Sequence, residues 1–216
     1  MNSPAEVQKA VFRRQLKQAV SLGKPITIHT REAEEDTEAI LMEEVPKDHK
    51  VHVHCFTDSP EFAQRLLSHF PNLCIGITGV ITYSTNLNTS EVIRRMMATG
   101  GGTALTDGSP LRILLETDAP YMVPSNIYES LALTSGGKNP RLAFSHSGMI
   151  AWTAGFVADI ANGASSSSTS LASSARVVEG THQNEDGDSE TTQGTVLDAN
   201  DVLEVSRRNA RLVYGV

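Results

Sequence analysis

Three side chains that can bind metal ions follow three short hydrophobic stretches of the sequence. His29 ends the stretch PITIH, His54 ends VHVH, and Asp118 ends LLETD. Each stretch is typical of a β-strand, and the carboxyl ends of parallel strands meet at one edge, where active sites gather. Imidazole suits Zn²⁺ and Mn²⁺, and a carboxylate suits these ions and Mg²⁺. The sequence therefore predicts a divalent metal site at His29, His54 and Asp118; the alternative is that each histidine is a hydrogen-bonded core residue.

Two further polar residues lie on the same strand faces, one step deeper. Side chains alternate along a strand, so His52 shares a face with His54, and Glu116 shares one with Asp118. Groups in such positions orient metal ligands through hydrogen bonds. We expect His52 and Glu116 to support the ligands from beneath, with a plain buried hydrogen-bonded pair as the alternative.

The elements that position these residues alternate between strands and helices. Amphipathic periodicity and helix-start signals predict helices at 3–23, 32–44, 58–70, 88–98, 141–162 and from 198 onward. Apolar runs predict strands at 25–29, 50–56, 73–78 and 111–118. This alternation predicts an α/β fold with a parallel sheet, which a doubly wound sheet and a barrel satisfy equally. The predicted strands are not followed by a glycine-rich phosphate fingerprint, which disfavours a nucleotide-binding sheet.

Residues 163–197 have a different composition from the rest of the chain. They are rich in serine, glycine, threonine and acidic residues and contain few apolar side chains. Such a segment buries too little surface to offset the entropy of ordering, so we predict a disordered insertion here. Order is expected to resume at Asp198, a residue that suits a helix N-cap.

The charge and cysteine content narrow the functional classes. The net charge is −7, so bulk electrostatic attraction does not hold this chain on nucleic acid, and bound cations or a local basic patch must supply it. Cys55 and Cys74 lie in apolar runs and are predicted to be buried free thiols. The sequence has no apolar run of about 18 residues, so we predict no membrane span. We therefore expect an intracellular protein, cytoplasmic or nuclear.

Several motifs resemble the TatD family of metal-dependent deoxyribonucleases, which belongs to the amidohydrolase superfamily of (β/α)8 TIM barrels. The motifs occur in the family's order and include GKPITIHTREAEED at 23–36, VHVHCFTDS at 51–59, LLETDAPYMVP at 114–124 and RRNARLVYG at 207–215. The resemblance implies a hydrolase that cleaves DNA phosphodiester bonds through metal-activated water.

The resemblance also implies roles for individual residues. His29 and His54 match metal ligands of the family, and Asp118 matches an aspartate that binds metal and takes the proton of the attacking water. Arg31 follows its ligand in the IHTR motif and is expected to contact substrate phosphate, with a surface salt bridge to Glu34 or Glu35 as the alternative. The expected cofactors are Mg²⁺, Mn²⁺ or Zn²⁺ ions, two in the full family and one here.

Two family motifs, an H-x-H ligand pair and a metal-bridging glutamate, have no match in this sequence. The resemblance therefore implies a partial barrel equivalent to strands five to eight: a TatD-like half barrel at 1–162, the insertion at 163–197, and a C-terminal helix at 198–216 that packs back on the barrel. We expect impaired nuclease activity from the chain alone. We also expect two open sheet edges, which favour self-association or a complementing N-terminal half.

Two other functions remain open at this point. Related barrels hydrolyse amides and esters. The three predicted metal ligands alone do not indicate whether the substrate is a phosphodiester, an amide or an ester. The missing motifs also allow a non-catalytic interaction protein that carries an acidic insertion.

Overall fold

The computed structural model describes residues 3–100, 109–134, 141–163 and 196–216. Most of the predicted insertion at 163–197 lies outside the described residues, as does most of the loop that precedes the fourth strand. Among the described residues, no helix is long and apolar enough to cross a membrane.

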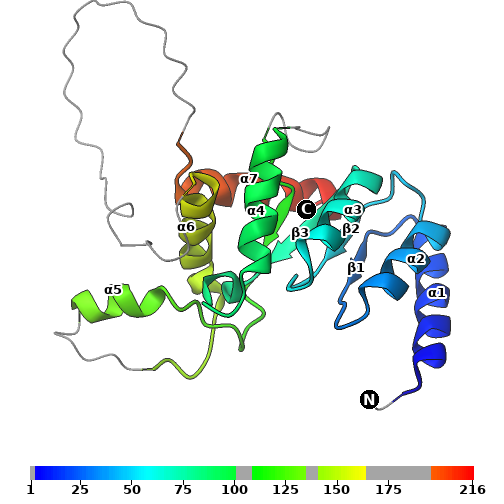
Figure 1. Ribbon diagram of the computed structural model, residues 1–216, viewed down its shortest axis with the longest axis horizontal. Coiled ribbons are helices and arrows are strands. Elements are labelled where there is room, and N and C mark those ends of the chain that lie inside the picture. The colour runs from blue at the N-terminus through cyan, green and yellow to red at the C-terminus, as the bar shows by residue number, and fades with distance from the viewer. Residues whose placement is uncertain (1–2, 101–108, 135–140, 164–195) are drawn as a thin grey trace, which may run out of the picture.

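Four parallel strands form one sheet in the order of the chain, as Figure 1 shows: β1 (Ile26–Ile28), β2 (Val51–Val53), β3 (Leu73–Ile77) and β4 (Ile113–Leu115). All four lie within the predicted strands but are shorter. Soon after β2 and β4 end, Cys55 and Asp118 adopt positive φ angles of 47° and 48°, which are not compatible with an extended strand. The sequence thus predicted an α/β fold with a parallel sheet correctly.

The helices are α1 (Ala5–Ser21), α2 (Glu34–Glu44), α3 (Pro60–His69), α4 (Asn88–Thr99), α5 (Ile127–Thr134), α6 (Ile150–Ala161) and α7 (Ala199–Tyr214), with 3₁₀ turns η1 (Gly79–Thr82) and η2 (Ser147–Met149). The prediction missed α5. It also placed the start of α6 too early: residues 141–146 form a loop, and the Ser145 N–H donates a hydrogen bond to the Pro120 carbonyl of another loop.

The aliphatic face of the sheet carries the main core. Alternate residues of the strands, such as Ile28, Val53, Ile75 and Ile113, are buried against helices that extend from α1 at one end of the sheet to α6 at the other (Figure 1). Burying each such side chain contributes roughly 1.5–3 kcal/mol to the free energy of folding. The opposite face is more polar: in the register of the sheet, Thr27 lies beside His52 and His52 lies beside Cys74. Cys55 and Cys74 are buried and free, as predicted.

The helix α7 covers the outer edge of β4. The Asn209 side-chain amide donates to the carbonyls of Leu111 and Ile113 at 3.0 Å each, and the Ser206 hydroxyl accepts a hydrogen bond of 2.8 Å from the Leu115 N–H. These are backbone groups that a neighbouring strand would otherwise pair. The prediction of two open sheet edges is therefore wrong for the β4 edge, where side chains of α7 satisfy the backbone.

Candidate metal centre

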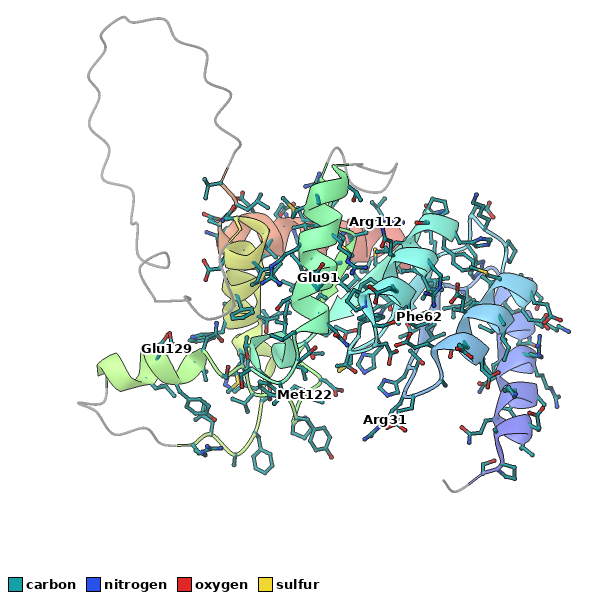
Figure 2. The ribbon with its side chains drawn as sticks, in the orientation of Figure 1. Arg31, Phe62, Glu91, Arg112, Met122 and Glu129 are labelled. Carbon is teal, nitrogen blue, oxygen red and sulfur yellow. The ribbon has the colours of Figure 1, made fainter. Side chains whose placement is uncertain are left out.

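The predicted site residues lie where strands β1, β2 and β4 end. His29 follows β1, His54 follows β2, and Glu116 and Asp118 follow β4. In Figure 2 the labelled Arg31 and Met122 mark two of the loops that leave these strand ends, and both loops lie at the same end of the molecule. Parallel pairing places the strand ends together, and Asp118 adopts a positive φ where the chain leaves β4.

His54 and Asp118 face each other at this end. The Nε2 atom of His54 is 3.7 Å from Oδ1 of Asp118, and the Nδ1 atom of His54 is 3.0 Å from Oε1 of Glu116. An ionised carboxylate only accepts hydrogen bonds, so Nδ1 carries the proton of the neutral imidazole and Nε2 presents a lone pair. A lone pair and a carboxylate oxygen then face one another, and a shared cation is the group that suits both. This donor pair therefore fits a divalent metal ion.

His29 stands next to this pair. Its ring centroid is 5.7 Å from that of His54, and the two rings are tilted by 49°. Within the described part of the chain, no three histidine, cysteine, aspartate or glutamate side chains are positioned together as a metal site. The structure thus brings His54 and Asp118 face to face and leaves His29 beside them. Arg31 is exposed on the loop after β1, at the outer edge of the molecule (Figure 2).

Glu116 lies beneath His54 and holds it. Its Oε1 atom also lies 2.6 Å from Nε2 of His52, a short contact outside good hydrogen-bond alignment, and its Oε2 atom accepts a hydrogen bond of 2.9 Å from the Cys55 N–H. Burial works to raise the pKa of the Glu116 carboxyl, but His52, His54 and the Cys55 N–H together outweigh it and lower that pKa. Glu116 therefore remains an ionised acceptor for His54 and lies in contact with His52.

Sequence reasoning missed two contributors to this site. Gly76 lies on β3, where a Cβ atom would stand 2.7 Å from His52 Nε2 and 2.8 Å from each Glu116 oxygen. A glycine inside an apolar strand signals such a close approach, so this contributor could have been found. Tyr214, at the end of α7, contacts His52 through its hydroxyl. The two residues are 162 positions apart, and the sequence carries no signal that joins them.

A second carboxylate site lies on the loop after β2. Burial and then the charge of Glu34 raise the pKa of Asp58 to about 6, against a smaller lowering by the Thr30 hydroxyl. Glu34 itself accepts hydrogen bonds from the N–H and hydroxyl of Ser59, the N-cap of α3. The Oδ2 atom of Asp58 is buried without a hydrogen-bond partner in the described structure.

We predict that Asp58→Asn stabilises the fold at neutral pH. The folded-state pKa of Asp58 lies above the unfolded value, so the carboxylate costs stability above about pH 6, and this cost disappears as the pH falls through 6 toward 3.8, the ordinary pKa of an aspartate. After allowance for solvent screening, we expect a gain of about 1 kcal/mol at about pH 8 and little change at about pH 4. Urea unfolding at both pH values measures this, with the exposed Asp48→Asn as the control. An equal effect of Asp58→Asn at both pH values would contradict the prediction.

Comparison with known proteins identifies the family to which this chain belongs. Histidine and carboxylate side chains at the carboxyl ends of a parallel sheet are typical of metal-dependent hydrolases. The family described as TatD related DNase matches residues 1–215. The chain therefore belongs to the TatD family of metal-dependent hydrolases, as the motifs indicated.

Several curated relatives are named as nucleases or hydrolases. The chain is 44% identical over 130 residues to the human 3′-5′ RNA nuclease TATDN2, covering 60% of this chain and 15% of that protein. It is 35% identical over 129 residues to the 3′-5′ ssDNA/RNA exonuclease TatD of Enterobacter lignolyticus, covering 58% and 43%. It is 33% identical over 122 residues to the uncharacterized metal-dependent hydrolase YabD of Bacillus subtilis, covering 56% and 42%. The chain thus spans less than half the length of each of these relatives.

Solved structures support the fold. A TatD family hydrolase from Entamoeba histolytica superposes with a TM-score of 0.60 at 15% identity, covering 99% of this chain and 59% of that one. An uncharacterized amidohydrolase from Saccharomyces cerevisiae gives a TM-score of 0.54 at 22% identity, covering 74% and 55%. At these identities the likeness concerns the fold alone.

Proposed function

We propose that this chain carries part of the active site of a metal-dependent nuclease, which hydrolyses phosphodiester bonds of DNA with water as the nucleophile. The observation that carries the proposal is the pair of acceptors, His54 Nε2 and Asp118 Oδ1, that face each other 3.7 Å apart. The printed names of the relatives support a nucleic acid substrate, and that of the human relative makes RNA the second substrate to test.

Each residue of the site has a role in this proposal. His54 and Asp118 would hold the cation, and His29 is adjacent as a further ligand. A bound Mg²⁺, Mn²⁺ or Zn²⁺ ion lowers the pKa of its water and neutralises phosphate charge. Asp118 would accept the proton of the attacking water, because its carboxylate lies at the strand ends beside His54. Arg31, exposed beyond the strand ends, binds a substrate phosphate through its guanidinium.

We further propose that the sheet is a sector of a (β/α)8 barrel, equivalent to strands five to eight. Two observations support this: the strands follow the order of the chain, and the aliphatic face of every strand packs against helices in one core. A doubly wound sheet instead reverses its strand order and covers both faces with helices. Because just two acceptor atoms face each other among the residues that the structure describes, the chain alone is expected to bind metal weakly and to act slowly. Self-association or a complementing chain would supply further ligands.

A substrate panel tests the function. The purified chain is incubated in excess over end-labelled single-stranded DNA, RNA or a small aryl ester, with Mg²⁺, Mn²⁺ or Zn²⁺. We expect slow shortening of the nucleic acids that a chelator stops and added metal restores. Cleavage of the ester without cleavage of nucleic acid would favour the amide or ester hydrolase. If nothing is hydrolysed and calorimetry detects no metal binding, the non-catalytic interaction protein is the better description.

A further inference from the structure

The last helix, α7, places the side chain of Tyr214 at the polar face of the sheet. Tyr214 is the final residue of α7, and Gly215 ends the helix directly after it in a left-handed conformation, with φ of 75°. At the other end of α7, Asp198 and Asp201 form a reciprocal capping box. Asn209 fastens the middle of the helix to β4 through two hydrogen bonds. A helix held along its length in this way presents Tyr214 in a defined position.

The Tyr214 hydroxyl joins two strands on that face. It lies 2.6 Å from Nδ1 of His52 on β2 and 2.7 Å from the hydroxyl of Thr27 on β1. The Tyr214 and His52 rings meet nearly edge to face, with centroids 6.0 Å apart and an angle of 85° between their planes. His52 is buried, so the Tyr214 hydroxyl is the group that satisfies its Nδ1 atom in place of water.

The direction of each hydrogen bond follows from the carboxylate beneath His54. Glu116 is an acceptor only, and His52 Nε2 lies 2.6 Å from its Oε1, so Nε2 carries the proton of the neutral His52 ring. The Nδ1 atom of His52 is then an acceptor, and the Tyr214 hydroxyl donates to it. The Tyr214 oxygen in turn accepts from the Thr27 hydroxyl. Hydrogen bonds therefore run from Thr27 through Tyr214 to His52, and the Nε2 atom of His52 contacts Glu116 Oε1 outside good hydrogen-bond alignment.

The Oε1 atom of Glu116 also accepts a hydrogen bond from His54. Oε1 lies 3.0 Å from Nδ1 of His54, while Oε2 is held by the Cys55 N–H at 2.9 Å. The hydrogen bond at Nδ1 helps to aim Nε2 at Glu116, so loss of the donor at Nδ1 removes one restraint on the orientation of the buried His52 ring. Glu116 then loses one of the contacts that fix Oε1 in place.

We propose that Tyr214 is a positioning residue for the metal centre: acting through His52 and Glu116, it keeps the proton of His54 on Nδ1 and the lone pair of Nε2 toward Asp118. The consequence for metal binding rests on the proposed function, whereas the arrangement of protons is a property of the metal-free chain. Side-chain contacts from Tyr214 through His52 and Glu116 thereby connect the end of α7 to His54 at the strand ends.

Tyr214→Phe tests this, because it removes the hydroxyl and keeps the ring. Nitrogen-15 NMR of the metal-free protein reports the His54 tautomer, and titration calorimetry with Mn²⁺ reports metal affinity. We expect a mixed His54 tautomer in the variant and a loss of affinity of about 10-fold. The matched control is Tyr83→Phe, which also removes one hydroxyl, here the donor to the Val123 carbonyl, and is expected to change neither measurement.

Gly76→Ala is a second variant that disturbs the contacts between His52, Glu116 and His54, here from β3. Its new Cβ would stand 2.8 Å from both Glu116 oxygens, so it displaces the carboxylate and is expected to disturb the His54 tautomer while Tyr214 stays intact. An unchanged His54 tautomer in Tyr214→Phe would overturn the inference. If the tautomer changes as expected but the native chain binds no Mn²⁺, the positioning role stands and the proposed metal-dependent function fails.

Discussion

Replacing His54 with alanine is expected to weaken binding of Mn²⁺ to this chain by about 100-fold and to remove its metal-dependent hydrolysis. The variant deletes Nε2, one of the two acceptors that face each other across 3.7 Å, and leaves Asp118 as a lone carboxylate. It also removes the donor to Glu116 Oε1. Titration calorimetry with Mn²⁺ and single-turnover cleavage of labelled DNA measure the two effects separately.

The size of the effect should depend on where the altered group lies. Glu116→Gln keeps the size of the side chain, removes the charge beneath His54 and leaves one acceptor oxygen for the two donors at His54 Nδ1 and the Cys55 N–H, so we expect an intermediate loss of affinity of about 10-fold. His69→Ala, at the end of α3, is the control and should leave affinity unchanged. If His54→Ala binds Mn²⁺ as tightly as the native chain does, the metal centre is not at the ends of β2 and β4.

Replacing Arg112 with methionine is expected to destabilise the fold by about 3 kcal/mol. The buried guanidinium donates to the carbonyls of Leu67, Phe70 and Pro71, at and just beyond the carboxyl end of α3. These carbonyls carry the negative end of the helix dipole, and methionine would leave them unpaired in the interior. Burial lowers the pKa of Arg112, and the carbonyls supply the compensating interaction for its charge.

Urea unfolding measures the cost, and Arg65→Met is the matched control. Arg65 lies on α3 and is about half exposed, and it makes an ion pair with Glu38 at 2.7 Å. An exposed pair contributes little to stability, so the control should shift the unfolding midpoint far less. Equal shifts for the two variants would mean that the three carbonyl contacts of Arg112 do not hold the end of α3.

Much of the fold could be predicted because its determinants are local. Apolar runs located all four strands, and helical periodicity located α1, α2, α3, α4 and α7. The ends of these elements were less predictable. Residues 141–146 were predicted as helix, yet Ser145 is engaged by the Pro120 carbonyl, a contact that no local pattern reveals. The missed helix α5 is a short segment whose apolar residues have no clear periodicity.

The sequence by itself determined which side chains stand at the strand ends. Alternation along the strands placed His52, His54, Glu116 and Asp118 on particular faces, and the parallel order brought the strand ends together. The tertiary structure decided how these groups meet: His54 faces Asp118, His29 stands to one side, and Tyr214 and Gly76 shape the space around His52 and Glu116. The physical reason is the distance along the chain over which each determinant acts. Periodicity and turn chemistry act over a few residues, whereas hydrogen-bond partners such as Tyr214 and His52 are selected by how whole helices pack on the sheet.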